Sequence, residues 1–396
     1  MAVTMLTHQM IAREAAAILE ESMYFSTRVN RGRESEFTQA VNGYKKGSSV
    51  TVMVPPAPIV YTGATFAEGG SAASYDEGSV SLTLDTQKHT GLTFGATERL
   101  LEMSEFRERI LKPSIASLGA TVEADLISRA CKMVPNIVGT AGSTPTTAKT
   151  FAQARAAMNR YLAPQDSRTL LITSEANVEM VDASKALFNP APSIAKMYQE
   201  GAVMGTFQGA ATFESVNMPS FGNGADIAMT VNGSQTEGSS TLAVTGNTSV
   251  AEGQVFTVPG VYAVHPLTGV ATTTLQQFVV TATSSSGNIS IFPPMKTAAP
   301  DKRISALPTA SDALTFVGSA STSYMRSLMF HRDAFTVAFA PLPILAGCEG
   351  YTYMADGMSV RVMTFGNGSN DTESTRIDVL YGIAAPRRLH ACQIIQ

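Results

Sequence analysis

The chain has few cysteines, no tryptophan and little charge. Charged residues make up 15% of its 396 residues, where about a quarter is usual for a globular protein. Its three cysteines lie far apart, so they predict neither a disulfide framework nor a zinc site. The formal net charge of −4 argues against a protein whose main task is to bind nucleic acid through a basic face. Low charge combined with many small residues indicates surfaces that other subunits cover.

Long apolar runs are missing as well. Arg13, Glu14 and Glu20 interrupt the start of the chain, so no signal peptide is expected there. No uncharged stretch is long and apolar enough to span a bilayer. We therefore expect a soluble protein that is made in the cytoplasm.

The motifs of common active sites are also lacking. The sequence contains no GxxxxGK[ST], no GxGxxG opening a helix, no HExxH, no GxSxG and no EF-hand pattern. Its five histidines are isolated, and each is more typical of a packed or surface residue than of a base or a ligand. We therefore expect no enzymatic activity, no cofactor and no metal.

The most regular stretch that is present runs from 113 to 134. Its apolar side chains recur at helical spacing, and they are Ile115, Leu118, Val122, Leu126 and Ile127. Pro113 suits a first helical turn and Pro135 ends the helix, while Glu123 lies mostly off the apolar stripe. The pattern predicts a single helix roughly 33 Å long.

Two further elements precede this helix. Residues 7–22 predict an amphipathic helix, and residues 23–47 predict an extended arm. Residues 49–61 and 80–84 predict two strands joined by a tip rich in Gly, Ala and Ser. Because a two-stranded hairpin is marginal in water, we expect it to lie on another surface.

The chain after the long helix divides by composition. Helices at 151–162 and 174–188 around a buried strand at 169–173 predict an α/β unit. Residues 226–300 carry few charges and many short strand patterns, which predicts an inserted all-β domain. Strands are expected again after residue 328.

This order of elements resembles the tailed-phage major capsid proteins with the HK97 fold. In particular it resembles the P22 coat-protein-like branch, which carries an inserted β-domain. The phrases that carry the resemblance are GQVFTVPGVYAVHPLTG (253–269), QQFVV (276–280), LMFHRDAFTVAFAPL (328–342) and RIDVLYGIAAPRRLHA (376–391). They are specific as a set rather than singly, and the resemblance covers nearly the whole chain.

The resemblance implies an α+β fold with named parts. These are an N-terminal arm (1–47), an E-loop (48–90), a P-domain with the spine helix (91–146 and 354–396), an A-domain (147–224 and 319–353) and an inserted β-barrel I-domain (225–318). The implied function is a non-enzymatic coat protein that self-assembles into pentamers and hexamers of an icosahedral shell around double-stranded DNA. The implied partners are other copies of the chain, a scaffolding protein and a portal, and assembly would take place in the bacterial cytoplasm.

Two sets of site residues follow as hypotheses. At the E-loop tip, Glu68, Asp76 or Glu77 would pair with a basic residue of the neighbouring subunit. The candidates for that residue are Arg361, Arg387 and Arg388. On the N-terminal arm, the acidic residues would contact a basic scaffolding protein; they are Glu14, Glu20 and Glu21. For the first set, plain solvation is the alternative, and a bound cation is less favoured.

Two functions from other classes stay open at the level of sequence. An encapsulin-like cargo compartment would share the fold, although the large β-insertion is less expected there. A phage tail or surface binding protein would explain the Gly/Thr-rich β-domain, but not the long helix or the hairpin. A hydrolase is less favoured, because no nucleophile and base can be named.

Overall fold

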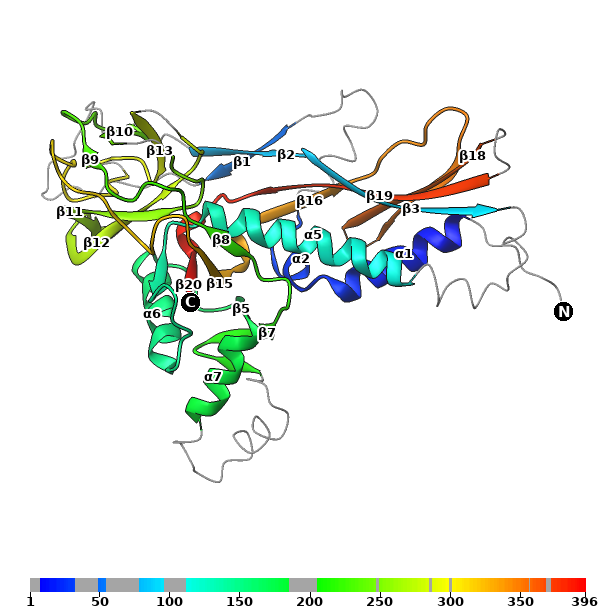
Figure 1. The fold of residues 1–396 in the computed structure, drawn as a ribbon, viewed down its shortest axis with the longest axis horizontal. Helices are drawn as coiled ribbons and strands as arrows, with labels where there is room; N and C mark the ends of the chain where they lie inside the picture. The colour runs from blue at the N-terminus through cyan, green and yellow to red at the C-terminus, as the bar shows by residue number, and fades with distance from the viewer. Residues whose placement is uncertain are drawn as a thin grey trace, which may run out of the picture. The chain divides into compact units, whose positions relative to one another are not determined.

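The computed structural model describes most of the chain, and its elements group into two compact units. Unit 1 comprises residues 1–52, 80–127 and 335–384, and unit 2 comprises the remaining segments, 53–79, 128–334 and 385–396. The residues that the structure describes are 8–32, 49–54, 78–95, 112–184, 205–246, 249–284, 287–298, 301–355, 357–367 and 372–396. Figure 1 labels the helices and strands used below.

Unit 1 is built on an antiparallel sheet in the order β16–β19–β18–β17, with β3 also paired to β19. These strands are β3 (Thr86–Gly95), β16 (Thr336–Ala340), β17 (Glu349–Ala355), β18 (Met358–Asn367) and β19 (Thr372–Ala384). Along β19, the buried Ile377, Val379 and Tyr381 alternate with Arg376 and Asp378. Since successive side chains point to opposite faces, the sheet has one apolar and one partly polar face.

Helices cover the apolar face of this sheet. α1 (His8–Ser22) contacts β17 and β18, and α5 (Lys112–Met133) is the predicted long helix. Tyr381 points from β19 towards α5, where its hydroxyl donates to Asp125 Oδ2 at 2.8 Å. α1 and α5 approach each other closely at Gly119, where a Cβ would run into α1. The lack of a side chain at this position therefore lets the two helices pack side by side (Figure 1).

The opposite face of the sheet receives a two-stranded hairpin. It is formed by β1 (Ser49–Val54) and β2 (Gly78–Thr83), which pair only with each other among the described strands. Val52 and Leu82 of this hairpin form an apolar cluster with alanines of β16 and β19. The expectation that the hairpin lies on another surface is thus confirmed at its base.

Unit 2 contains a mixed sheet in the order β4–β20–β15–β5–β7–β6, with β8 paired to β15. The strands are β4 (Ile137–Gly139), β5 (Arg168–Ile172), β6 (Thr206–Phe207), β7 (Ala210–Glu214), β8 (Ser220–Gly222), β15 (Ser323–His331) and β20 (Ala391–Ile395). α6 (Ala148–Arg160) and α7 (Ser174–Ser184) pack on it through a common core that includes Phe151, Leu170 and Met329. This is the predicted α/β unit.

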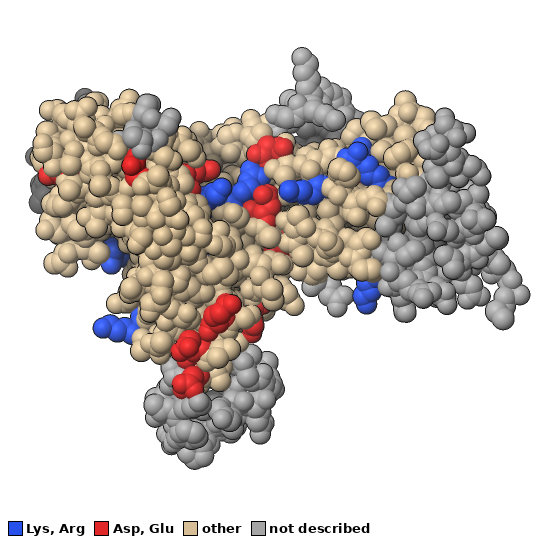
Figure 2. Space-filling model, viewed as in Figure 1, with Lys and Arg blue, Asp and Glu red and all other residues tan. Residues whose placement is uncertain are grey.

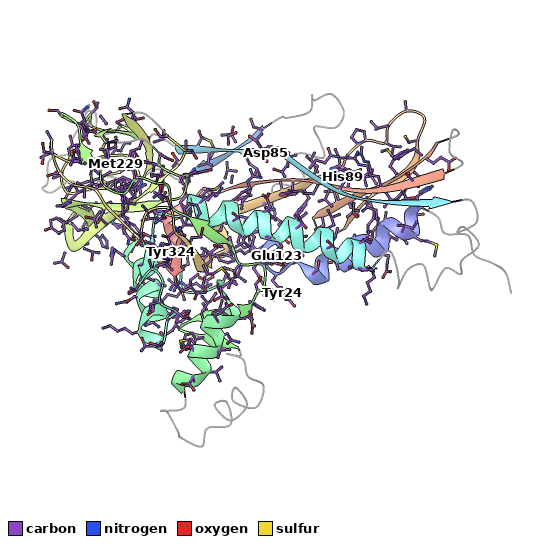
Figure 3. The ribbon with its side chains drawn as sticks, in the orientation of Figure 1. Tyr24, Asp85, His89, Glu123, Met229 and Tyr324 are labelled. Atoms are coloured by element: carbon purple, nitrogen blue, oxygen red, sulfur yellow. The ribbon has the colours of Figure 1, made fainter. Side chains whose placement is uncertain are left out.

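Unit 2 also holds the inserted β-domain. Its sheet runs in the order β14–β11–β12–β13–β10–β9. The strands are β9 (Thr230–Val231), β10 (Thr241–Thr245), β11 (Val255–Val264), β12 (Ala271–Val280), β13 (Asn288–Phe292) and β14 (Thr315–Phe316). The core contains stacked rings of Phe256 and Phe278, with centroids 5.6 Å apart, and Met229, which Figure 3 labels. The all-β character predicted for residues 226–300 is confirmed.

The structure differs from the sequence expectations in the N-terminal arm and in the C-terminal strands. Within the arm that was expected to be extended, α2 (Tyr24–Arg28) forms a short helix. The strand pairing also divides the C-terminal part of the chain between two sheets, because β18 and β19 lie in unit 1 and β20 lies beside β15. Long-range pairing of this kind leaves no local signal in the sequence.

Candidate assembly surfaces

The base of the β1–β2 hairpin is fitted closely to β19. At Gly382 of β19, a Cβ would run into the backbone carbonyl oxygen of Thr83, where β2 ends, and would come within 3.1 Å of Leu84 Cα. Only glycine leaves this space, so residue 382 fixes how closely the hairpin approaches the sheet. The acidic residues predicted at the hairpin tip lie outside the described residues; they are Glu68, Asp76 and Glu77.

A buried ion cluster lies on the partly polar face of the unit 1 sheet. Asp378 is fully buried, and its Oδ2 accepts from Arg361 Nε at 3.2 Å and from Nη2 at 2.8 Å. Its Oδ1 accepts from Arg376 Nε at 2.7 Å and from Gln87 Nε2 at 2.9 Å. One carboxylate therefore joins three strands, β3, β18 and β19, through two guanidinium groups and an amide.

The predicted site residue Arg361 belongs to this cluster. Its side chain is 6% exposed, and Nη1 donates to the carbonyl oxygen of Pro343 at 2.6 Å. Arg376 was not predicted, yet its side chain is 33% exposed on the same face. Gln87 and His89 of β3 are exposed, and Figure 3 labels His89 on this strand. This face thus presents polar side chains around a buried, internally paired Arg361.

The other two predicted basic residues lie in unit 2, before β20. Arg388 is half-buried, and its guanidinium lies over the ring of Phe292 at 4.8 Å from the centroid. Burial lowers the pKa of Arg388 below its usual value. The backbone N–H of Arg387, which is also half-buried, donates to the carbonyl oxygen of Ala334 at 3.4 Å. Arg388 therefore packs on the inserted β-domain as well as carrying charge.

The predicted acidic residues of the N-terminal arm lie on α1. Glu14 and Glu20 are half-buried, whereas the side chain of Glu21 lies outside the described part of the chain. Arg13 of the same helix lies over the ring of Tyr353 at 5.6 Å, and His8 Nε2 is 2.9 Å from Thr364 Oγ1. α1 is thus a docked helix of unit 1.

A buried carboxylate links the arm to the long helix. Glu123 of α5 is fully buried, and it accepts the backbone N–H of Tyr24 at 3.0 Å and of Phe25 at 3.0 Å (Figure 3). Burial raises the pKa of Glu123, and the two backbone donors oppose that rise. Glu123 was expected mostly off the apolar stripe of α5, yet it is buried, because α2 covers that side of α5.

The inserted β-domain is bound to the rest of unit 2 by glutamine side chains. Gln277 of β12 donates from Nε2 to the carbonyl oxygen of Ile137 at 2.8 Å, and its Oε1 accepts the N–H of Ile137 at 2.9 Å. Gln276 accepts from the Tyr161 hydroxyl at 3.1 Å. Lys132 and Glu252 add an ion pair at 3.9 Å. Because the Gln277 side chain both donates to and accepts from the backbone of Ile137, it fixes the register and the distance between the inserted β-domain and β4.

A second buried guanidinium lies at this junction. Arg326 of β15 is 1% exposed, and its Nη1 donates to Gln393 Oε1 at 2.5 Å and to the Gly253 carbonyl oxygen at 3.4 Å. Gln393 in turn donates to the carbonyl oxygens of Cys131 and Val134 at the end of α5. No local pattern marks Arg326 as buried, since an arginine in a strand is normally exposed.

The described residues hold neither a possible metal site nor a helix that could span a membrane. No group of three or more His, Cys, Asp or Glu among them could hold a metal ion. Cys131 is buried, and burial raises the pKa of its thiol to about 12, so it is not a nucleophile at neutral pH. No helix in the described part of the chain is long and apolar enough to cross a membrane.

Comparison with solved structures finds phage capsids. The chain is similar to a structure of Mycobacterium phage Che8 (11% identity, 94% of this chain, 90% of that chain, TM-score 0.43). It is also similar to a capsid structure of the cyanophage P-SCSP1u (9% identity, 89% and 83%, TM-score 0.46). The I-domain of the CUS-3 coat protein matches 24% of this chain over 97% of its own length (24% identity, TM-score 0.19). No curated protein matches the chain.

The family assignment comes from the sequence itself. Residues 25–391 match the family described as P22 coat protein, gene protein 5, and this range is most of the chain. Together with the long α5, the β1–β2 hairpin and the inserted β-domain, the match identifies the mixed α+β fold as HK97-like with an I-domain. Proteins of this family are structural and not enzymes, and they form an icosahedral shell from copies of one chain. The chain therefore belongs to the P22 coat protein family and is the major capsid protein of a P22-like tailed phage.

Proposed function

We propose that the chain forms pentamers and hexamers of its shell, in which the E-loop of one subunit lies over the P-domain of the next. The supporting observation is the β1–β2 hairpin, whose base packs on unit 1 through Val52 and Leu82. Two strands cannot bury a core of their own, so we expect a neighbouring subunit to cover the part of the hairpin beyond its base. Burying apolar surface contributes about 25 cal/mol of free energy per Å², and this gain would be repeated at every subunit contact around a capsomer.

The shell would enclose double-stranded DNA without reading its sequence. A net charge of −4 suits a container better than a specific DNA-binding protein. A scaffolding protein and a portal would take part in assembly inside the bacterial cytoplasm.

Negative-stain electron microscopy tests this assembly. The protein is expressed alone and with the products of its neighbouring genes. We expect spherical shells far larger than an ordinary oligomer, closed regularly only when a scaffolding protein is present. A small monodisperse oligomer under both conditions would refute the proposal.

Charge pairing between subunits is the second part of the proposal. Acidic residues of the E-loop tip would bind basic residues of the neighbour, with Glu68, Asp76 and Glu77 facing Arg361, Arg387 or Arg388. On Arg361, the incoming carboxylate would share a guanidinium that already binds Asp378. The double change Asp76→Lys with Glu77→Lys should lower shell stability, whereas Asp76→Glu with Glu77→Asp keeps the charge and serves as control. Equal stability of both variants would rule the pairing out.

The scaffolding contact is the third part. We expect Glu14, Glu20 and Glu21 of α1 to attract a basic segment of that protein. Deleting the helix would also remove its packing on β17 and β18, so charge neutralisation to Gln is the cleaner test. Scaffold incorporation should fall in the triple Gln variant and persist in a triple Asp variant. Normal incorporation in both would exclude these residues.

A further inference from the structure

The sequence holds four asparagines that are followed directly by glycine. The structure describes two of these Asn-Gly pairs completely, and both belong to unit 2. The pair at 223 and 224 follows β8, and the pair at 232 and 233 follows β9 in the inserted β-domain (Figure 1). In the other two pairs, at 42 and 367, at least the glycine lies outside the described part of the chain. The two described pairs allow a comparison within one unit.

An Asn-Gly pair can lose ammonia without an enzyme. The backbone nitrogen of the glycine attacks the side-chain carbonyl carbon of the asparagine, and because glycine has no Cβ the two groups can approach closely. The side-chain NH2 then leaves as ammonia with the proton of the backbone N–H, and a succinimide ring remains. Water breaks one of the ring C–N bonds and gives aspartate or isoaspartate. One water is taken up and one ammonia is released, and nothing is oxidised or reduced.

The fold holds Asn223 in place and so prevents this reaction. Its side chain is buried, and Nδ2 donates to the carbonyl oxygens of Val317 at 3.0 Å and Ser319 at 3.1 Å. The backbone of Gly224 is packed closely, because a Cβ there would lie 2.5 Å from the carbonyl oxygen of Ser249. The amide that must react is thus bound on both of its hydrogens, and the glycine has no room to move towards it.

The reacting groups of Asn232 and Gly233 are accessible instead. Asn232 is exposed, and no described residue forms a hydrogen bond with its side chain or with the N–H of Gly233. At Gly233, where φ is +65°, nothing lies within 4 Å of the position of a Cβ. The turn itself is held elsewhere, because Asn232 N–H donates to the carbonyl oxygen of Ala243 at 2.9 Å and its own carbonyl oxygen accepts from Gln235 Nε2 at 3.0 Å.

We propose that Asn232 is a site of spontaneous deamidation in the folded subunit, with water as the co-reactant, and that the fold protects Asn223. The product adds a carboxylate to a domain that carries little charge, as the mostly uncharged surface in Figure 2 shows. Residues 226–300 hold three acidic residues and one lysine, so their net charge would change from −2 to −3. Because the reaction is irreversible, the negative charge of the inserted β-domain grows with the age of the subunit.

Peptide mass spectrometry measures both asparagines in one fragment. A protease that cleaves after glutamate releases residues 215–237, which contain Asn223 and Asn232. The folded wild-type subunit is incubated at mildly alkaline pH, and conversion is followed by the gain in mass when NH2 is replaced by OH. Asn232 should convert at least about tenfold faster than Asn223, because the two hydrogen bonds of the Asn223 amide must open first. A sample digested at the start corrects for conversion during digestion.

Unfolding provides the matched control. In guanidinium chloride the folded contacts are gone and both asparagines precede glycine, so their rates should approach each other. Asn232→Gln lengthens the side chain, which disfavours ring closure, and should abolish conversion at this position in the folded subunit. Equal rates at Asn223 and Asn232 in the folded wild type would overturn the proposal, as would an unchanged Asn232 after a time in which the unfolded chain converts. The measurement needs no shell, so its outcome is independent of the proposed assembly.

Discussion

Units 1 and 2 each bury an arginine, but they compensate its charge in different ways. In unit 1, Arg361 binds the buried carboxylate of Asp378, which a second arginine, Arg376, also binds. In unit 2, the donors of Arg326 reach Gln393 and the Gly253 carbonyl, and Phe221 lies 4.2 Å below its guanidinium. None of the described residues offers Arg326 a carboxylate.

This difference determines how the stability of each unit should respond to the loss of a charge. Arg326 lies near the C-terminal end of α5, where the backbone carbonyl oxygens carry partial negative charge. Gln393 lies between them, because its Nε2 donates to the carbonyl oxygens of Cys131 and Val134 and its Oε1 accepts from Arg326. Burial nevertheless lowers the pKa of Arg326 to about 10, so its charge is incompletely compensated. Without the Arg326 guanidinium, only neutral acceptors lose a partner, namely Gln393 and the Gly253 carbonyl. Without the Asp378 carboxylate, the guanidinium groups of Arg361 and Arg376 lose their counter-charge. We therefore expect unit 1 to be more sensitive to the loss of a single charge.

The largest effect should follow from Asp378→Asn in unit 1. The change keeps the size of the side chain but leaves the buried Arg361 without its counter-charge. Breaking a buried ion pair on one side costs about 3–5 kcal/mol. Urea unfolding of the unassembled subunit measures this loss.

Arg376→Met is the matched control for Asp378→Asn. Its side chain is 33% exposed and Asp378 keeps Arg361, so the loss should be at most about 1 kcal/mol. Equal losses of unfolding free energy in the two variants would show that the buried charge of Asp378 contributes little to the stability of the cluster.

Arg326→Met should destabilise unit 2 less than Asp378→Asn destabilises unit 1. The methionine fills much of the volume, and the acceptors left without a donor are neutral, which costs about 1–3 kcal/mol. Hydrogen exchange in β15 and β20 reports on this junction directly. A larger loss for Arg326→Met would reverse the comparison and identify Arg326 as the main support of the I-domain junction.

Gly382→Ala tests the close fit of the base of the β1–β2 hairpin in unit 1. The added Cβ would run into the Thr83 carbonyl, so β2 must move away from β19. Overpacking of this kind costs about 1–3 kcal/mol. Gly91→Ala in β3, where nothing lies within 4 Å of the new Cβ, should change stability little. Because the base of the β1–β2 hairpin should move only in Gly382→Ala, we expect altered shells in that variant alone. Normal shells with normal stability in Gly382→Ala would contradict the close fit.

The elements that the sequence predicted correctly are those with a local pattern. α5 was predicted at 113–134 and lies at 112–133, because its apolar residues repeat at helical spacing. The I-domain was visible as a change of composition. β3 was not predicted, since its pairing with β19 joins residues almost 300 positions apart, as in Gly91 with Arg376.

The candidate site could be predicted only in part. Arg361 was chosen as a basic residue near the end of the chain, but its bond to Asp378 follows from a cross-strand register that the sequence does not display. Glu123 and Arg326 were missed for a related reason. Each is a charged residue whose burial follows from the groups that meet it in the fold. These are two backbone N–H groups for Glu123, and Gln393 with the Gly253 carbonyl oxygen for Arg326.

Near neutral pH the smallest effect is expected from His390, whose contribution to the stability of unit 2 depends on pH. His390 and His331 lie edge to face, with ring centroids 6.3 Å apart, and Arg387, Asp333, Asp166 and Arg168 are the charges around them. Burial, Arg387 and His331 lower the pKa of His390 to about 4. Between about pH 6.5, its value in an unfolded chain, and pH 4, the unfolded state binds more protons.

The contribution of His390 to stability should therefore be full above pH 6.5 and lost as the pH falls through 4. His390→Gln removes the titrating group, so the free energy of unfolding should vary less with pH in that window than in the wild type. The unit 1 variant Arg376→Met should keep the wild-type slope, because the charge it removes lies in the other unit. Identical slopes for His390→Gln and the wild type would mean that this histidine is as readily protonated in the fold as in the open chain. Unit 2 would then owe its acid response to other groups.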